Sequence, residues 1–256
     1  MTSRASFAIV TGGCSGLGHA TASALIKAGW QVCIFDLNKD NGAQIALDLS
    51  TSACFFEYVD VTSSESVEKA IAKYAQNEIR LVVNCAGVAP AKRILNRDGE
   101  AMPLADFAKV ININLVGSFN VCRVAASAMA KNSPMNDDGS RGVIINTASV
   151  AGYEGQIGQT AYAASKAGLI GLSLPMARDL APVGIRVNTI APGVMGTPML
   201  LAMPDNVQTA LAANVQHPKR LGLPEEFAKL VIHITDNPYI NGETIRLDGA
   251  LRMPPK

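Results

Sequence analysis

The sequence lacks an excess of charge of either sign and any long uncharged hydrophobic run. Its 22 Lys and Arg residues nearly balance 21 Asp and Glu residues, and the formal net charge is +1. This balance argues against a polyanion-binding surface, so no nucleic-acid partner is expected. No apolar run approaches the roughly 18 residues that a membrane-spanning helix needs, so no membrane partner is expected either.

Closely spaced metal-ligating or redox-active residues are also missing. The three histidines, His19, His217 and His233, have no partner at metal-ligand spacing, and no metal site is expected. The five cysteines form no C-x-x-C pair and mostly lie in apolar stretches: Cys14, Cys33, Cys54, Cys85 and Cys122. This cysteine usage favours a reducing compartment and predicts a cytoplasmic location. Residues 1–4 lead almost directly into the first apolar run, which leaves no space for a cleavable signal.

Short apolar runs alternate with longer helical patterns along all 256 residues, without a linker between them. Strands are expected at 7–10, 31–35, 53–59, 80–84, 142–147, 185–190 and 243–247. Helices are expected at 19–29, 63–76, 104–131, 161–180 and 225–235, and the polar residues 62–65 resemble a helix start. Continuously apolar strands belong to parallel sheets that are buried on both faces. The pattern predicts one α/β domain, residues 1–256: a Rossmann-type, doubly wound parallel sheet of about seven strands with helices on both faces.

Three segments interrupt the alternation of strands and helices. Residues 131–141 are polar and turn-rich, which predicts a surface loop. Residues 89–103 and 195–220 follow the carboxyl ends of expected strands, the edge at which open α/β sheets bind ligands. We therefore expect a substrate loop at 195–220. Its Met195, Met199 and Met203 have helical spacing, so they form either core packing or an adaptable apolar lid.

A glycine pattern follows the first expected strand. Residues 11–18 read T-G-x-x-x-G-x-G, where a strand turns into a helix whose N-terminus can bind a dinucleotide pyrophosphate. Asp36 ends the next strand about 20 residues later, where a carboxylate binds ribose hydroxyls and repels a 2′-phosphate. These residues favour NAD as the cofactor over NADP. The alternative for Asp36 is a turn cap shared with Asn38.

A second pattern, Tyr-x-x-x-Lys, lies downstream at Tyr162 and Lys166. Residues at i and i+4 share one helical face, and a nearby ammonium should lower the pKa of the phenol and make it a general acid or base. Ser149, at the end of an expected strand, could donate a hydrogen bond to a substrate oxygen that gains negative charge. Alone, Tyr-x-x-x-Lys is more often a surface pair; with Ser149 and the glycine pattern it predicts hydride transfer.

These residues resemble the short-chain dehydrogenase/reductase family over essentially the whole chain. The matching positions are 11–18, 60–61, 84–87, Asn114, Ser149, Tyr162, Lys166 and 192–193. One departure is Cys85, where the family's N-N-A-G signature has a second Asn, and this changes what lines the adenosine site.

The family resemblance also implies individual roles. Ser149 would contact the substrate oxygen, Tyr162 would donate the proton, and Lys166 would hold the nicotinamide ribose. Asn114 would anchor a water that relays protons, although a buried Asn that satisfies backbone groups is the alternative. Gln159 would face the substrate together with Ser149 and Tyr162. Besides Tyr162 and Lys166, the implied cofactor contacts are Gly12, Ser15, Gly16, Leu17, Gly18, Asp36, Asp60, Val61, Cys85, Ala86, Gly87, Pro192, Met195 and Thr197.

Segments 141–151, 154–166, 174–187 and 241–253 are most similar to the 3-hydroxyacyl-CoA dehydrogenases of that family, which are also described as hydroxysteroid dehydrogenases. The resemblance implies an NAD-dependent homotetramer that interconverts (S)-3-hydroxyacyl-CoA and 3-oxoacyl-CoA in fatty acid metabolism. The short N-terminus favours a bacterial counterpart. The alternatives are a hydroxysteroid or other secondary-alcohol dehydrogenase, a 3-oxoacyl carrier-protein reductase, which Asp36 disfavours, and a non-catalytic scaffold, which the intact Ser149, Tyr162 and Lys166 disfavour.

An acyl-CoA substrate would need cations near the rim of the site for its phosphates. Lys92, Arg93 and Arg97 lie in one candidate loop, and Lys219 and Arg220 lie at the end of the other. Either cluster could form charge-assisted contacts with phosphate. The alternative is a solvated basic face.

Overall fold

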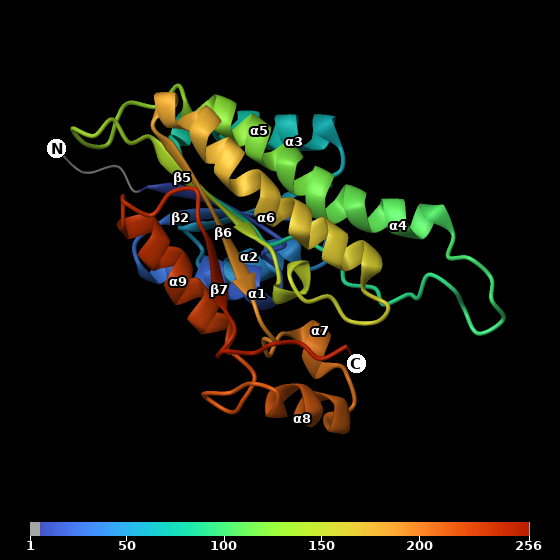
Figure 1. The fold of residues 1–256 in the computed structure, drawn as a ribbon. Helices are drawn as coiled ribbons and strands as arrows, with labels where there is room; N and C mark the ends of the chain where they lie inside the picture. Colours follow the sequence, from blue (N-terminus) through green and yellow to red (C-terminus); the bar gives the residue numbers. More distant parts are fainter. Residues whose placement is uncertain (1–5, 256) are drawn as a thin grey trace.

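A computed structural model describes residues 6–255, which build one seven-stranded parallel sheet in the order β3-β2-β1-β4-β5-β6-β7 (Figure 1). The strands are β1 (Phe7–Thr11), β2 (Gln31–Asp36), β3 (Cys54–Tyr58), β4 (Ile79–Asn84), β5 (Gly142–Thr147), β6 (Ile185–Pro192) and β7 (Thr244–Leu247). All seven expected strands are present, with ends that differ by no more than two residues. The predicted fold class, a doubly wound parallel α/β sheet, is confirmed.

The central strands β1, β4 and β5 are buried along their entire length, as their mainly apolar sequences predict. Strand β1 pairs with β2 on one side and with β4 on the other, so the chain reverses its direction of winding between β3 and β4. At such a reversal the connections leave the carboxyl ends of neighbouring strands in opposite directions, which opens a crevice there. The topology therefore places the binding edge beside β1 and β4.

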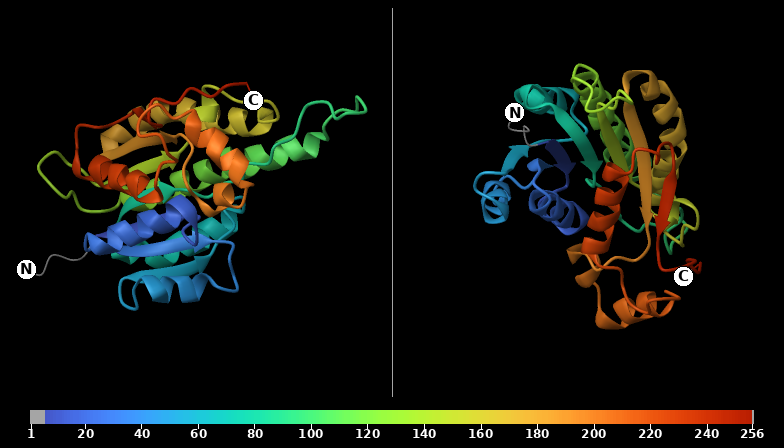
Figure 2. Two further views of the ribbon diagram at one scale, coloured as in Figure 1. Left: turned by 90° about the horizontal axis from the view of Figure 1, so that it is seen from below. Right: turned by 90° about the vertical axis from the view of Figure 1, so that its left-hand side faces the viewer.

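Helices cover both faces of the sheet, as the views in Figures 1 and 2 show. They are α1 (Gly16–Lys27), α2 (Gly42–Leu49), α3 (Ser64–Tyr74), α4 (Leu104–Ile111), α5 (Gly117–Met129), α6 (Thr160–Leu180), α7 (Pro198–Leu201), α8 (Asp205–Ala213) and α9 (Pro224–Asp236). Side chains of α3, α5 and α6 share one buried cluster with the strands, and those of α1, α2 and α9 share the other. The two clusters form the two layers of core on either side of the sheet.

Three regions differ from the sequence-based expectation. The single helix expected at 104–131 is divided into α4 and α5 by a π-helical turn, η2 (Asn112–Val116), which inserts an extra residue and often marks a functional site. The segment 195–220, expected as a loop, contains the short helices α7 and α8. Helix α2 had not been predicted. The expected helix start at 62–65 is confirmed, because the Ser63 side chain accepts from the backbone N–H of Ser66 at 3.2 Å.

The cysteines are all free thiols, and Cys33, Cys54 and Cys122 are buried among apolar side chains. Burial raises the pKa of Cys54 to about 11 and that of Cys122 to about 12. These thiols therefore pack as small neutral hydrophobic groups. Among residues 6–255, no helix combines the length and the apolar character that crossing a bilayer requires.

Candidate active site

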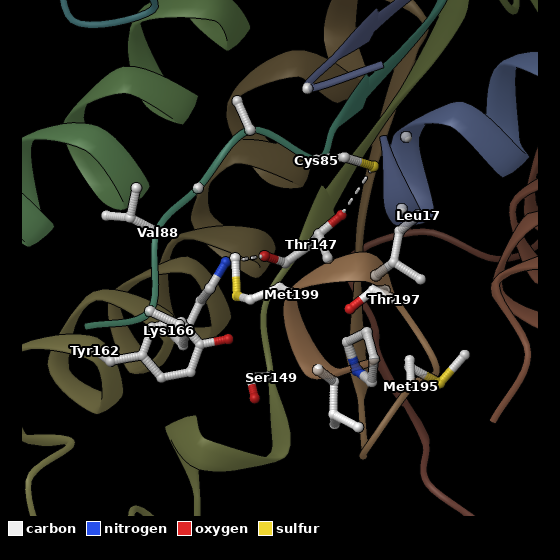
Figure 3. A pocket seen from close by; sticks show the side chains of 18 of the residues that line it. Leu17, Cys85, Val88, Thr147, Ser149, Tyr162, Lys166, Met195, Thr197 and Met199 are labelled. Atoms are coloured by element: carbon white, nitrogen blue, oxygen red, sulfur yellow. Dashed lines mark hydrogen bonds between the residues drawn. The ribbon is translucent and has the colours of Figure 1, made fainter. Parts of the chain in front are cut away.

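A cavity of about 830 Å³ opens at the carboxyl ends of β1, β4, β5 and β6. Figure 3 shows Ser149, Tyr162 and Lys166 lining it together with Leu17, Cys85 and Thr197. Of the residues predicted for the site, only Asn114 does not line the cavity. The others are Gly12, Ser15, Gly16, Leu17, Gly18, Asp36, Asp60, Val61, Cys85, Ala86, Gly87, Ser149, Gln159, Tyr162, Lys166, Pro192, Met195 and Thr197.

The glycine turn between β1 and α1 has almost no space for side chains. Gly12 has a left-handed backbone with φ 64°, and a Cβ there would lie 2.9 Å from the Ala86 backbone. A Cβ on Gly18 would lie 2.3 Å from the Gly12 carbonyl oxygen. The N-cap residue of α1, Ser15, makes no side-chain capping bond, so the first N–H groups of the helix remain available. A bare turn that leads into an uncapped helix N-terminus fits a pyrophosphate.

Asp36 lies beside this turn at the end of β2. Its Oδ2 accepts from the Cys14 backbone N–H at 3.0 Å, and its Oδ1 accepts from the Asn38 N–H at 3.0 Å. The turn cap with Asn38, weighed as an alternative, is therefore present, and the carboxylate also braces the glycine turn. Each carboxylate oxygen can accept more than one bond, so Asp36 can still face a ligand from the cavity wall. Among the described residues that line the cavity, Lys166 is the only Lys or Arg, so no other cation is available there for a 2′-phosphate.

A second turn follows β4 and packs against the first. The Thr11 hydroxyl oxygen accepts from the backbone N–H groups of Cys85 and Ala86 at 3.1 and 3.0 Å. These contacts use backbone atoms, which explains why Cys can replace the usual Asn at position 85 without loss of the turn. Burial raises the pKa of the Cys85 thiol to about 11. A neutral thiol thus lines this part of the cavity.

Tyr162 and Lys166 lie on α6, one helical turn apart, with the ammonium 5.7 Å from the centre of the phenol ring. The Lys166 Nζ donates to the Thr147 carbonyl oxygen at 2.7 Å, and burial lowers the pKa of Lys166 to about 8. Burial raises the pKa of Tyr162, and the nearby Ser149 hydroxyl opposes this. The structure thus differs from the expected lowering of the Tyr162 pKa. The reason is that the ammonium bonds to Thr147 while the apolar surroundings penalise a phenolate.

Ser149 follows β5 and begins the short helix η3 (Val150–Gly152). Its Oγ accepts from the Ala151 backbone N–H at 3.1 Å, which fixes the side chain at the cavity wall. Because this contact uses the oxygen as an acceptor, the hydroxyl hydrogen can be donated to another group. The residue is therefore placed and oriented as a donor toward the cavity.

Asn114 is fully buried in the π-turn η2, behind the cavity wall. Its side-chain Oδ1 accepts from the Val88 N–H at 2.8 Å, and its Nδ2 donates to the Val88 carbonyl at 2.9 Å and to Ser165 Oγ at 3.0 Å. These contacts match the alternative of a buried Asn that satisfies backbone groups. A proton relay through Asn114 would therefore use its backbone, because both the Oδ1 and the Nδ2 of its side chain already form hydrogen bonds.

Several cavity-lining residues were not predicted from the sequence. Thr147 supplies the carbonyl that holds Lys166, a backbone role without a side-chain signal. Val207 and Leu211 line the cavity from α8, and their helical spacing within the expected loop was a signal that could have found them. Met253 reaches the cavity from the C-terminal segment, more than 85 residues beyond Lys166.

Comparison with known proteins agrees with this geometry. The short chain dehydrogenase family model matches residues 6–208. The chain belongs to this family. It is 52% identical over 250 residues to a 3-hydroxyacyl-CoA dehydrogenase type-2 of Drosophila melanogaster, covering 96% of this chain and 97% of that one. A Bos taurus protein of the same name is 51% identical over 251 residues, covering 97% and 95%.

A solved structure points in the same direction. The crystal structure of a 3-hydroxyacyl-CoA dehydrogenase type-2 from Mycobacterium avium has a TM-score of 0.92 to this chain at 45% identity, and the match covers 99% of this chain and 98% of that one. This short-chain dehydrogenase is therefore an oxidoreductase, as its sequence predicted, and the family resemblance is confirmed.

Proposed function

We propose that this enzyme interconverts (S)-3-hydroxyacyl-CoA and 3-oxoacyl-CoA with NAD as the cofactor. The observation that carries the proposal is that Ser149, Tyr162 and Lys166 line the same cavity as the glycine turn. The chain is also about half identical to relatives named for this reaction. The cofactor, when bound, accepts or supplies the hydride, and the residues of the chain orient the substrate and move the proton.

In the direction of ketone reduction, Ser149 donates a hydrogen bond to the substrate carbonyl and stabilises the negative charge that develops on its oxygen. Tyr162 donates the proton to that oxygen. Its raised pKa keeps the phenol protonated near neutral pH, which is the form that reduction needs. Lys166 keeps a positive charge beside Tyr162 and binds the nicotinamide ribose. Gln159 contacts the substrate near Tyr162 from the cavity wall.

NAD use is supported by the residues around the glycine turn. Asp36 offers a carboxylate to the ribose hydroxyls and would repel a 2′-phosphate. The remaining proposed contacts are Gly12, Ser15, Gly16, Leu17 and Gly18 at the first turn, Asp60, Val61, Cys85, Ala86 and Gly87 beside it, and Pro192, Met195 and Thr197 after β6. Thr197 lies against the first turn, since a Cβ on Gly16 would be 3.4 Å from its methyl carbon.

The phosphates of the CoA moiety need cations outside the cavity. Lys92 already pairs with Asp106, and Arg220 is held by both oxygens of Glu226 at 2.9 and 2.7 Å. Within residues 6–255, neither Arg93 nor Lys219 takes part in an ion pair, and both are exposed. We propose that Arg93 contributes to phosphate binding, because a cation without a carboxylate partner loses no existing contact when a phosphate arrives.

The test of the reaction is the absorbance of NADH while acetoacetyl-CoA, a ketosteroid and a carrier-linked 3-oxoacyl thioester are offered in turn. Oxidation of NADH with acetoacetyl-CoA in clear preference to the other two supports the proposal. Faster turnover of the ketosteroid would favour a hydroxysteroid dehydrogenase, which the apolar side chains of Met199, Leu200 and Val207 in the cavity would also accommodate.

The contact with CoA has its own test, Arg93→Glu compared with Lys219→Glu. We expect Arg93→Glu to raise the KM for acetoacetyl-CoA severalfold at low salt and less at high salt, because exposed charges are screened. The KM for a short 3-oxo ester without CoA should stay unchanged. If only Lys219→Glu has this pattern, the phosphates bind at the end of the 195–220 substrate loop instead.

We also propose that the protein works as a homotetramer in the cytoplasm. Large apolar side chains are exposed along α4, η2 and α5, namely Leu104, Val116 and Phe119. Several large apolar side chains exposed on neighbouring helical turns are what a protein interface would cover. Light scattering coupled to size-exclusion chromatography tests the assembly, and a monomeric mass would contradict it.

A further inference from the structure

The C-terminal segment folds back over the loop between β5 and α6, which carries Ser149. The Ile157 backbone N–H donates to the Pro255 carbonyl at 3.0 Å, and the Gln156 side chain donates to the Pro254 carbonyl at 3.1 Å. The Met253 N–H donates to Glu154 Oε2 at 3.0 Å. Three consecutive residues of the C-terminal segment are thus bonded to a loop almost one hundred residues earlier in the chain.

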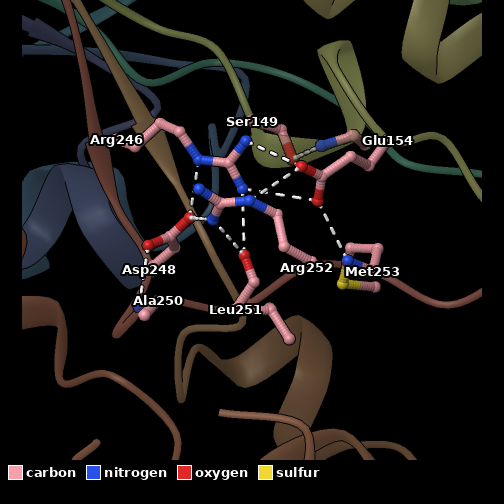
Figure 4. A network of polar contacts seen from close by, with 9 residues as sticks. Ser149, Glu154, Arg246, Asp248, Ala250, Leu251, Arg252 and Met253 are labelled. Carbon is pink, nitrogen blue, oxygen red and sulfur yellow. Dashed lines mark hydrogen bonds and ion pairs between the residues drawn. The ribbon is translucent and has the colours of Figure 1, made fainter. Parts of the chain in front are cut away.

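A cluster of charged side chains fastens this segment (Figure 4). Arg246 of β7 binds both oxygens of Glu154, at 2.9 and 3.3 Å, and its Nε donates to Asp248 at 2.7 Å. It also donates to the Leu251 carbonyl at 3.0 Å. Arg252 lies 3.3 Å from both Glu154 and Asp248. We name Glu154, Arg246, Asp248 and Arg252 the C-terminal clamp.

The clamp is more than a surface ion pair. The side chains of Arg246 and Glu154 are 23% and 24% exposed and that of Asp248 is 8% exposed, so solvent screens their charges only partly. The two-oxygen contact between Arg246 and Glu154 fixes the orientation of both groups. The Arg246 guanidinium also lies 5.3 Å from the centre of the Tyr153 ring. Arg246 therefore connects β7, the loop after Ser149 and the C-terminal segment.

The clamp and the backbone bonds of the C-terminal segment place Met253 at the cavity. No clamp residue lines the cavity among the described residues, but Met253 does, together with Ser149, Gln156 and Tyr162. Its side chain is apolar and flexible, and its backbone N–H is already bonded to Glu154. The side chain can therefore contact an apolar part of a substrate without any polar group to satisfy.

We propose that the segment Leu251–Pro255 holds Met253 in a fixed place in the wall of the substrate cavity and that Met253 determines which acyl chains the enzyme accepts. Glu154 and Arg246 are positioning residues for this wall. The inference rests on the proposed function and adds to it the residue that contacts the acyl chain. The class of ligand is the apolar tail of a 3-oxoacyl thioester, because Met253 offers dispersion contacts and no hydrogen bond.

The test of the wall is the ratio of kcat/KM for 3-oxooctanoyl-CoA to that for acetoacetyl-CoA, measured with NADH. We expect Met253→Ala to raise this ratio by about tenfold, since even one methylene group in an apolar pocket is worth roughly 10- to 200-fold in specificity. Met253→Phe should lower the ratio. The Kd of NADH, followed by its fluorescence, should stay within about twofold of wild type in both variants.

The clamp is tested by Arg246→Met, with Arg123→Met as the matched control. Arg123 forms an ion pair with Glu68 at 2.9 Å between α5 and α3, away from the cavity lining. We expect Arg246→Met to raise the KM for both thioesters and to change their ratio while NADH binding is retained. Arg246→Lys should restore part of the effect because it retains the charge but not the two-oxygen contact. The control should change neither KM nor ratio.

Each outcome bears on the inference. If the wild type turns over both thioesters and neither Met253 variant changes the ratio beyond twofold, the wall is refuted while the proposed function stands. If Arg246→Met behaves as Arg123→Met does, the positioning role is refuted. Absence of wild-type turnover with any 3-oxoacyl-CoA would overturn the proposed function and, with it, the acyl-chain role of Met253.

Discussion

The cavity has two ends, one proposed for the cofactor and one for the substrate, and different parts of the chain form them. The cofactor end consists of backbone turns held by Thr11 and Asp36, where even one added carbon atom at Gly18 would meet a carbonyl oxygen at 2.3 Å. The proposed substrate end includes flexible side chains of the segment that carries α7 and α8, where Met199 and Met203 are 56% and 43% exposed. If cofactor and substrate bind as proposed, the chemistry depends on tightly fixed groups, whereas the choice of substrate depends on flexible apolar side chains.

The largest effect should follow from removing the proton donor. Tyr162→Phe deletes one oxygen atom, and we expect kcat for ketone reduction to fall by about 10²- to 10⁴-fold. Binding of NADH and the melting temperature should stay close to wild type, because the phenol is not part of the turns that form the cofactor end. Turnover at the wild-type rate would mean that another residue donates the proton.

The rigidity of the cofactor end can be tested with two glycines that both lie in helices. Gly18→Ala forces a methyl group against the Gly12 carbonyl, and we expect it to cost about 1–3 kcal/mol of stability and to weaken NADH binding at least tenfold. Gly171→Ala in α6 is the control, because its Cβ would meet no atom within 4 Å.

In the control, Gly171→Ala, the alanine should stabilise α6 by up to about 1 kcal/mol. Denaturant unfolding and NADH titration measure both variants. If Gly18→Ala kept normal affinity, the first turn would be more adaptable than its contacts indicate, and the contrast between the two ends would weaken.

The protonation of Lys166 provides a pH test at the boundary between the two ends. Burial lowers the pKa of Lys166 to about 8, so the ammonium is present below that pH and lost above it. Tyr162, whose pKa is raised, keeps its proton throughout this range. We therefore expect kcat for ketone reduction to fall as the pH rises through about 8, by no more than tenfold per pH unit. A flat profile between pH 7 and 10 would show that the charge of Lys166 is not needed for turnover.

A smaller change is expected at the adenosine side. Asp36→Asn keeps an oxygen acceptor for the backbone of Cys14 or Asn38 but loses the negative charge. The preference for NADH over NADPH should narrow by about tenfold, corresponding to about 1.4 kcal/mol. Asp40→Asn, at an exposed position that does not line the cavity, is the control and should leave the preference unchanged. If wild type and Asp36→Asn had the same preference for NADH over NADPH, the Asp36 carboxylate would not be the group that selects the cofactor.

The same contrast explains how much could be predicted from the sequence. The sheet was predictable because apolar runs such as 7–10 and 142–145 indicate strands that are buried on both faces. The glycine turn at the proposed cofactor end was predictable because its geometry requires glycine at particular spacings. The substrate end was not: Met253 reaches the cavity through a clamp whose members are far apart in the chain, and no local pattern records that contact.

Two further differences between the sequence-based expectation and the structure have local physical causes. The π-turn η2 requires only one extra residue in a helix of continuous periodicity, so the sequence 104–131 predicts a single helix. The pKa of Tyr162 depends on a balance between burial and a nearby charge, and spacing alone gives the neighbour but not the depth of burial.

The smallest effect should come from the substrate end, at Met199. This side chain lines the cavity but is half exposed, and leucine has nearly the same volume. A volume-conserving apolar exchange usually costs less than about 1.5 kcal/mol even in a packed core, and a partly exposed position should cost less. We therefore expect Met199→Leu to keep kcat/KM for acetoacetyl-CoA within about twofold of wild type and to leave NADH affinity unchanged. A tenfold loss would show that α7 contacts the substrate as specifically as the turns contact the cofactor, and the two ends of the cavity would then differ in composition but not in precision.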